Sequence, residues 1–201
     1  MAVPATGPHR LEPWETRMLR WFLRRQIAAF ERSWNYDVSC VNDMIEADPA
    51  TVLALMKAAR MGHHRKDIPP AAHYAAKIVG VMAEDCGPCT QLAISMAERD
   101  GVDPAVLRAV VARDFAAMPY EVALAARFAE LTLRRAPEAD DVREEVVRLW
   151  GKRALISLAL ALAAARIFPT VKYALGHGHA CTRLTIGGEA RPVLREMTQA
   201  A

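Results

Sequence analysis

The sequence predicts an all-α protein, and three observations lead to this fold class. Apolar residues recur at helical spacing along most of the 201 residues, and prolines stand where new helices should begin. Hydrophobic residues make up 53% of the chain but aromatic residues only 6%, so the core consists mainly of small and aliphatic side chains that suit closely packed helices. The sequence shows no convincing strand apart from a short extended stretch in the tail, at Leu184–Ile186.

The N-terminal part of the chain is predicted to be an extension before the main domain. Residues 1–9 contain two prolines and a glycine and are expected to lack regular structure. A helix follows from Pro13, with an apolar stripe flanked by arginines. Such a stripe usually marks an interface, so we expect it to form a homo-oligomer; the alternatives are a helix that packs on the core and a basic helix that lies on a membrane surface. The stripe consists of Trp14, Met18, Trp21 and Phe22.

The remaining helices are placed by their start and stop signals. Asp48-Pro49 and Asp103-Pro104 each pair a capping residue with a proline suited to the first helical turn, and Gly176 is a typical helix end. These boundaries give an N-terminal extension over 1–48, a helical domain over 49–176 and a tail over 177–201. The predicted helices span about 49–62, 70–83, 86–100, 104–114, 119–135, 138–149 and 152–167, with a short continuation over 169–175.

Composition limits the partners and the location of the protein. The formal net charge of +3 is too small to indicate binding to nucleic acid. The longest apolar run, 154–168, is shorter than the ~20 residues that a membrane span needs, so we expect a buried helix and no membrane. Four cysteines form no dense disulfide framework, and the N-terminus has no apolar signal core. We therefore expect a cytoplasmic protein.

The chemistry is expected at the Cys-Gly-Pro-Cys motif, residues 86–89, which opens a helix. Two cysteines on the first helical turn have both sulfurs on one side, as a reversible disulfide requires. The helix N-terminus favours the thiolate, whereas Glu84 and Asp85 raise the pKa of a thiol, so the direction of the net shift stays open. Asp85 is alternatively the cap of the helix. Cys86, at the cap, is expected to face solvent, with Cys89 one turn further in.

Two other interpretations of the motif remain. The same spacing provides half of a zinc site, which His177, His179 and Cys181 have the right chemistry to complete. Against this, residues 176–181 are also typical of a flexible segment after a helix, with His177 near the terminal carbonyls of that helix. Cys181 could instead be a third redox cysteine that exchanges disulfides with the pair. The last interpretation is a helical scaffold whose chemistry has lapsed. A thioredoxin fold is not indicated, because no strand precedes the motif.

Three features, in order along the chain, carry a family resemblance. A helix leads into the CxxC motif over residues 74–89, the segment AARFAELT covers residues 125–132, and an apolar helix ends in ARIFPTVKYALG over residues 165–176. Together they resemble the carboxymuconolactone decarboxylase family, particularly its alkylhydroperoxidase D-like branch. The likeness covers roughly residues 50–176.

The resemblance implies a six-helix, homo-oligomeric domain whose cysteine pair works as a thiol-disulfide reductase or peroxidase. The substrate would be a peroxide or a disulfide, and a thiol-reductant protein would restore the pair; we expect no cofactor. In the well-characterised branch, a histidine four residues after the second cysteine and a glutamate about three helical turns before the first assist the pair. Those two positions hold Ala93 and Tyr74 here. Nothing identifies a lactone-acid site, so decarboxylase activity is not indicated.

Other residues must therefore activate the thiol. The nearby residues with suitable side chains are His73, Tyr74, Glu84 and Gln91, and Glu84 also reads as an ordinary solvated residue before a helix. Which of the two cysteines attacks stays open. The predicted catalytic set is Cys86, Cys89, Glu84, Tyr74 and His73.

Overall fold

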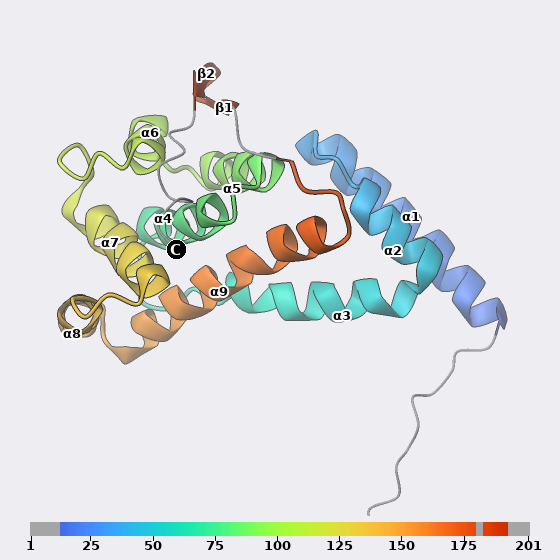
Figure 1. Cartoon of the computed structure of the whole chain (residues 1–201), viewed down its shortest axis with the longest axis horizontal. Helices are drawn as coiled ribbons and strands as arrows, with labels where there is room; N and C mark the ends of the chain where they lie inside the picture. The colour runs from blue at the N-terminus through green and yellow to red at the C-terminus, as the bar shows by residue number, and fades with distance from the viewer. Residues whose placement is uncertain (1–12, 180–182, 193–201) are drawn as a thin grey trace, which may run out of the picture. The chain divides into compact units, whose positions relative to one another are not determined.

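The computed structural model describes residues 13–179 and 183–192, and within these ranges the chain is helical apart from one antiparallel hairpin (Figure 1). The predicted all-α fold class is confirmed. The described elements, in chain order, are α1 (Pro13–Trp34), α2 (Ser39–Ala47), α3 (Pro49–Ala59), the 3-10 helix η1 (Arg60–His63), α4 (Pro70–Ala83), α5 (Gly87–Arg99), α6 (Pro104–Ala112), α7 (Tyr120–Arg134), α8 (Ala139–Trp150), α9 (Lys152–Ala174), β1 (Arg183–Ile186) and β2 (Glu189–Pro192).

The chain divides into two compact units, Met1–Leu55 and Met56–Ala201. The division lies inside α3, and not between residues 48 and 49 where the sequence suggested it. Val52 explains the difference, because this α3 residue is only 1% exposed and belongs to the hydrophobic core of the first unit.

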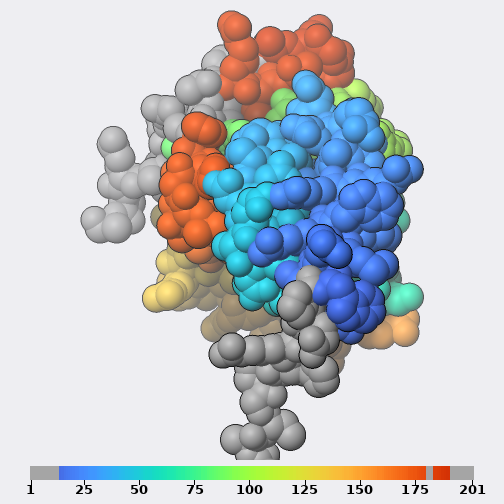
Figure 2. Space-filling model, turned by 90° about the vertical axis from the view of Figure 1, so that its right-hand side faces the viewer, coloured from blue at the N-terminus to red at the C-terminus, as the bar shows by residue number. Residues whose placement is uncertain are grey.

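In the first unit, α1 packs on α2, a helix that the sequence analysis did not predict. Glu46 of α2 joins the two helices: its carboxylate pairs with Arg24, and its backbone carbonyl accepts a hydrogen bond of 2.9 Å from Arg20. The opposite side of α1 carries the predicted apolar stripe, and Figure 2 shows this helix, in dark blue, at the surface. The stripe residues are 49–66% exposed: Trp14, Met18, Trp21 and Phe22.

In the second unit, α4 packs against α5, α7 and α9 (Figure 1). Small residues allow this close packing. At Gly80 an added Cβ would lie 3.0 Å from Leu162 Cδ1 and 3.2 Å from the Cβ of Ala165, so α4 and α9 nearly touch there. This close approach holds the end of α4, and the turn that follows it, against α9.

Helix α9 differs from its prediction in two ways. It runs unbroken through Pro169 to Ala174, and only one of its faces is buried, because Ile156 on the other face is 53% exposed. At 23 residues it is also long and apolar enough to cross a membrane, although core helices of soluble proteins meet the same criterion, and 39% of its apolar window is buried inside the structure. The helix that the sequence predicts to be buried is therefore buried on one face only.

The hairpin of β1 and β2 belongs to the core of the second unit. Leu184 and Ile186 are 1% and 0% exposed and lie in its main hydrophobic cluster. The Gln91 side chain of α5 donates to the carbonyl of Thr185 over 3.0 Å and accepts from its amide over 2.7 Å. The predicted extended stretch is confirmed, and of the predicted tail over 177–201 the described strand β1 packs on the core through Leu184 and Ile186. Gln91 holds the hairpin.

Candidate functional site

The CxxC motif lies where α4 turns into α5. Asp85 adopts the left-handed conformation with a φ of 47°, and its amide donates to the carbonyl of Met82 over 3.0 Å. Cys86 occupies the cap position of α5, and Pro88 lies in the first turn, where its missing N–H has no helical partner to lose. The interpretation of Asp85 as the cap is therefore wrong, because Asp85 closes the preceding turn.

Both cysteines are reduced and buried. Cys86 is 0% exposed and Cys89 5% exposed, in a small cluster with Val81 that Ala93 and Ala165 cover. The expectation that Cys86 faces solvent is wrong.

The segment that follows α9 is hydrogen-bonded to the motif. After Gly176, which has a φ of 81°, the chain turns back, and the amide of His177 donates to the carbonyl of Lys172 over 2.8 Å. The amide of Gly87 then donates to the carbonyl of His179 over 3.0 Å. The segment 176–179 is thus bound to Gly87, the first residue of α5 and the second residue of the motif.

The surroundings of Cys86 favour its thiolate. A hydrogen bond with the thiol of Cys89 lowers the pKa of Cys86 to about 7, from the ordinary 9.0. Burial opposes this shift by raising the pKa, the Cys89 amide and the positive charge of Lys172 lower it, and Asp85 raises it. A substantial fraction of Cys86 is therefore thiolate at neutral pH, and the thiolate is the nucleophilic form.

Lys172 is the functional candidate that sequence reasoning missed. It is 2% exposed, although lysine is almost never fully buried without a charged or polar neighbour. It lies two helical turns after Ala165, which packs on the cysteines, and so on the same face of α9. A lysine in the last turn of an apolar helix was the available signal, but its spacing also fits an exposed helix end.

Glu84 and Asp85 are both anchored to α9. Glu84 pairs with Arg166 and accepts a hydrogen bond of 3.5 Å from the hydroxyl of Thr170. The hydroxyl of Tyr173 donates to the carbonyl of Asp85 over 2.9 Å. With its side chain 18% exposed, Glu84 is not the solvated residue of the alternative interpretation. It fixes the turn before Cys86.

Tyr74 does not reach the cysteines. Its hydroxyl donates to Asp100 over 2.9 Å, and Asp100 is the residue that ends α5, whereas Cys86 precedes the start of that helix. The 13 residues of α5 place about 20 Å between its two ends. Burial, followed by the contact with Asp100, raises the pKa of Tyr74. Tyr74 is therefore no candidate for activating either thiol.

His73 also lies in the first turn of α4, far from the motif along that helix. It is 2% exposed, and its Nε2 atom has no hydrogen-bond partner among the described residues. Burial, followed by the charges of Lys77 and Arg65, lowers its pKa to about 4. Of the predicted catalytic set, the structure thus brings together only Cys86, Cys89 and the turn residue Glu84.

The described residues offer no complete metal site. Within 13–179 and 183–192, no group of three or more His, Cys, Asp or Glu side chains is close enough to share a metal ion. His179 is bonded to the motif through its backbone carbonyl, the backbone amide of His177 is bonded to Lys172, and Cys181 lies outside the described residues.

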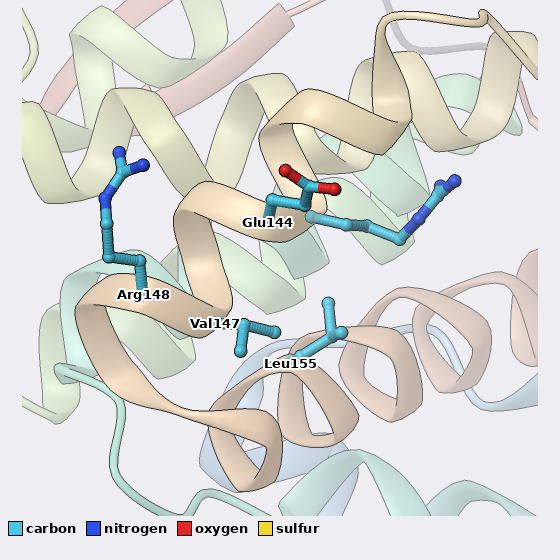
Figure 3. A pocket seen from close by; sticks show the side chains of 5 residues that line it. Glu144, Val147, Arg148 and Leu155 are labelled. Carbon is cyan, nitrogen blue, oxygen red and sulfur yellow. The ribbon is translucent and has the colours of Figure 1, made fainter.

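A shallow hollow between α8 and the start of α9 is separate from the cysteine pair (Figure 3). The side chains that line it are Arg143, Glu144, Val147, Arg148 and Leu155.

Fold and site together define an all-α protein with a buried, reduced CxxC pair at a helix N-terminus. No protein-family model, curated protein or solved structure matches the chain.

The segment 176–179 is expected to control access to the thiols. An added Cβ at Gly178 would overlap the ring of Tyr173, so Gly178→Ala must displace the ring or the segment. We expect the cysteines of this variant to react with a disulfide reagent about tenfold faster than those of the wild type. A tenfold change corresponds to a free energy of local opening that is lower by ~1.4 kcal/mol. Gly188→Ala, which strains a left-handed backbone position (φ 79°) on the hairpin without a steric clash, is the control for general destabilisation. Equal reactivity of the Gly178 variant and wild type would exclude control by this segment.

Proposed function

We propose that this protein is a thiol-disulfide oxidoreductase of the peroxidase type, with Cys86 and Cys89 as its redox pair. The observation that carries the proposal is the hydrogen bond between the two reduced thiols, which lowers the pKa of Cys86 to about 7. Without it, burial in an apolar cluster would raise the pKa of Cys86 and make this thiol inert.

The reaction with a hydroperoxide uses both cysteines. A thiolate attacks the peroxide, so that an S–O bond forms, the O–O bond breaks, and the leaving alkoxide takes a proton. The sulfenic acid is then attacked by the second thiol, which forms the disulfide and releases water. In sum, one dithiol and one hydroperoxide give one disulfide, one alcohol and one water. A dithiol protein would restore the pair by exchange, and a disulfide substrate would react through a mixed disulfide.

Several features support this function over the alternatives. A lapsed scaffold has no need of a thiol with a lowered pKa, and two sulfurs supply only half of a tetrahedral zinc shell. The resemblance to the alkylhydroperoxidase D-like branch supports the same chemistry. A reducing, cytoplasmic location and a homo-oligomer, with α1 as the contact, belong to the proposal. They are expected from the sequence and from the exposed stripe on α1.

A thiol titration of the purified protein tests the proposal. We expect a stoichiometric pulse of hydroperoxide to remove two thiols per chain together, and a dithiol to restore both. The titration is repeated with a chelator. Thiols that stay reduced would contradict the redox function, and thiols that are masked until the chelator is added would indicate a metal site instead.

A further inference from the structure

We propose that Lys172 is the positioning residue of this redox centre: its positive charge holds Cys86 as the attacking thiolate, while Cys89 resolves. The proposal rests on the redox function and adds both the activating group and the order of the two cysteines. In this proposal a lysine of α9 activates the thiol. The resemblance expects a histidine of α5 to do so, but this chain has Ala93 at that position.

The placement of Lys172 supports this role. Ala165 packs on the cluster that contains both cysteines, and residues seven positions apart lie on the same face of a helix. Lys172 is one of five polar or charged residues that are buried among the described residues, and it is 2% exposed. A charge in that position acts through little water, so its effect on a nearby sulfur is strong.

The backbone around Lys172 fixes it relative to the motif. Its carbonyl accepts the amide of His177, and two residues later the carbonyl of His179 accepts the amide of Gly87. The hydroxyl of Tyr173, the residue after Lys172, donates to the carbonyl of Asp85, the residue before Cys86. The chain that directly follows Lys172 is thus hydrogen-bonded to both neighbours of Cys86.

The charges that face Cys86 come from three elements. Cys89 of α5 and Lys172 of α9 favour the thiolate, and Asp85 of the α4–α5 turn opposes it. Glu84 of the same turn is neutralised by its ion pair with Arg166 of α9.

The contacts around the motif distinguish the two sulfurs. Cys86 lies between Asp85 and Gly87, the two residues to which Tyr173 and His179 are hydrogen-bonded, and the hydrogen bond with Cys89 lowers the pKa of Cys86, so we assign the attack to this sulfur. The first bond to the peroxide oxygen therefore forms at Cys86, and Cys89 closes the disulfide with release of water.

The test is the pH profile of alkylation by iodoacetamide on the full chain, with the modified cysteine located by mass spectrometry. Wild type is expected to be modified first at Cys86. In Lys172→Met, the midpoint of the profile should rise by about one pH unit, with an unchanged rate at high pH. Lys172→Arg should restore the wild-type midpoint. Lys152→Met, at the exposed start of the same helix, is the matched control.

The outcomes separate charge from packing. An unchanged midpoint in Lys172→Met, or an equal rise in Lys172→Arg, would overturn the role of the charge, and first modification at Cys89 would overturn the order. Should Lys172→Met fail to fold, Lys172→Gln is measured with the same criteria. Alkylation needs no peroxide, so a failed peroxide titration with a shifted midpoint contradicts only the proposed function. A successful titration with an unshifted midpoint contradicts only the role of Lys172.

Discussion

Cys86→Ser is expected to abolish the reaction with hydroperoxide, whereas Cys89→Ser is expected to stop it after the first step. Serine at position 86 removes the thiolate that the hydrogen bond from Cys89 stabilises. Serine at position 89 leaves the nucleophile in place but removes the thiol that resolves the sulfenic acid. The rate of peroxide consumption should therefore fall to the uncatalysed level in the first variant. The second should consume one equivalent and then stop.

The measurement is peroxide consumption together with dimedone labelling, which traps sulfenic acids. We expect a dimedone adduct on Cys86 in Cys89→Ser, no adduct in Cys86→Ser, and disulfide in wild type. Cys40→Ser is the matched control, because this buried cysteine belongs to the first unit and should behave as wild type. An adduct on Cys89 in the Cys86 variant would reverse the order of attack, and full turnover in both variants would contradict the redox pair.

Below neutral pH, the protein is expected to lose stability through His73. The folded state holds the pKa of His73 at about 4, chiefly through burial, against an ordinary value of 6.5. Between these values the unfolded chain binds the proton and the folded chain does not, so the stabilisation is present above pH 6.5 and is lost as the pH falls toward 4. The loss amounts to about 3 kcal/mol at most, which is a large part of the stability of an ordinary domain.

Urea unfolding at several pH values between those limits measures this effect. His73→Leu should show a flatter pH dependence than wild type, even if its stability at neutral pH is lower. His64→Gln, a change at an exposed neighbouring histidine, should keep the wild-type dependence. The same slope in wild type and His73→Leu would show that another group causes the acid sensitivity. Lys77, Arg65 and His63 face His73 and lower its pKa, so they are the next positions to test.

Local signals in the sequence were sufficient to locate most of the helices. Proline in the first turn and a glycine at the end act within a few residues, and the observed starts of α3, α4 and α6 lie at prolines. The missed helix α2 has only nine residues, and its start is marked by hydrogen bonds of 3.0 Å from the amide and the hydroxyl of Ser39 to Asp37. Such a hydrogen bond from a side chain to the backbone forms equally well in a turn, so it did not distinguish a short helix from a turn.

The candidate site was only half predictable. The cysteine pair is adjacent in the sequence and needed only a helix start to bring the sulfurs together. Tyr74 was chosen by its distance along the chain, but α4 and α5 pack together after a short turn, so a residue early in α4 meets Asp100 at the end of α5. Tyr74, about three helical turns before Cys86 along the chain, therefore lies at the end of α5 that is far from the cysteines.

The sequence by itself determined the all-α fold class, the start of the helix at the CxxC motif, and the residue types available for its chemistry. Only the tertiary structure decided that Cys86 is buried, that Glu84 is held by Arg166, and that Lys172 is buried with its charge close enough to act on Cys86. The physical reason is that helix starts depend on neighbours along the chain. Burial and charge at a sulfur instead depend on which helix face packs against it, and here that face belongs to α9, some eighty residues further along.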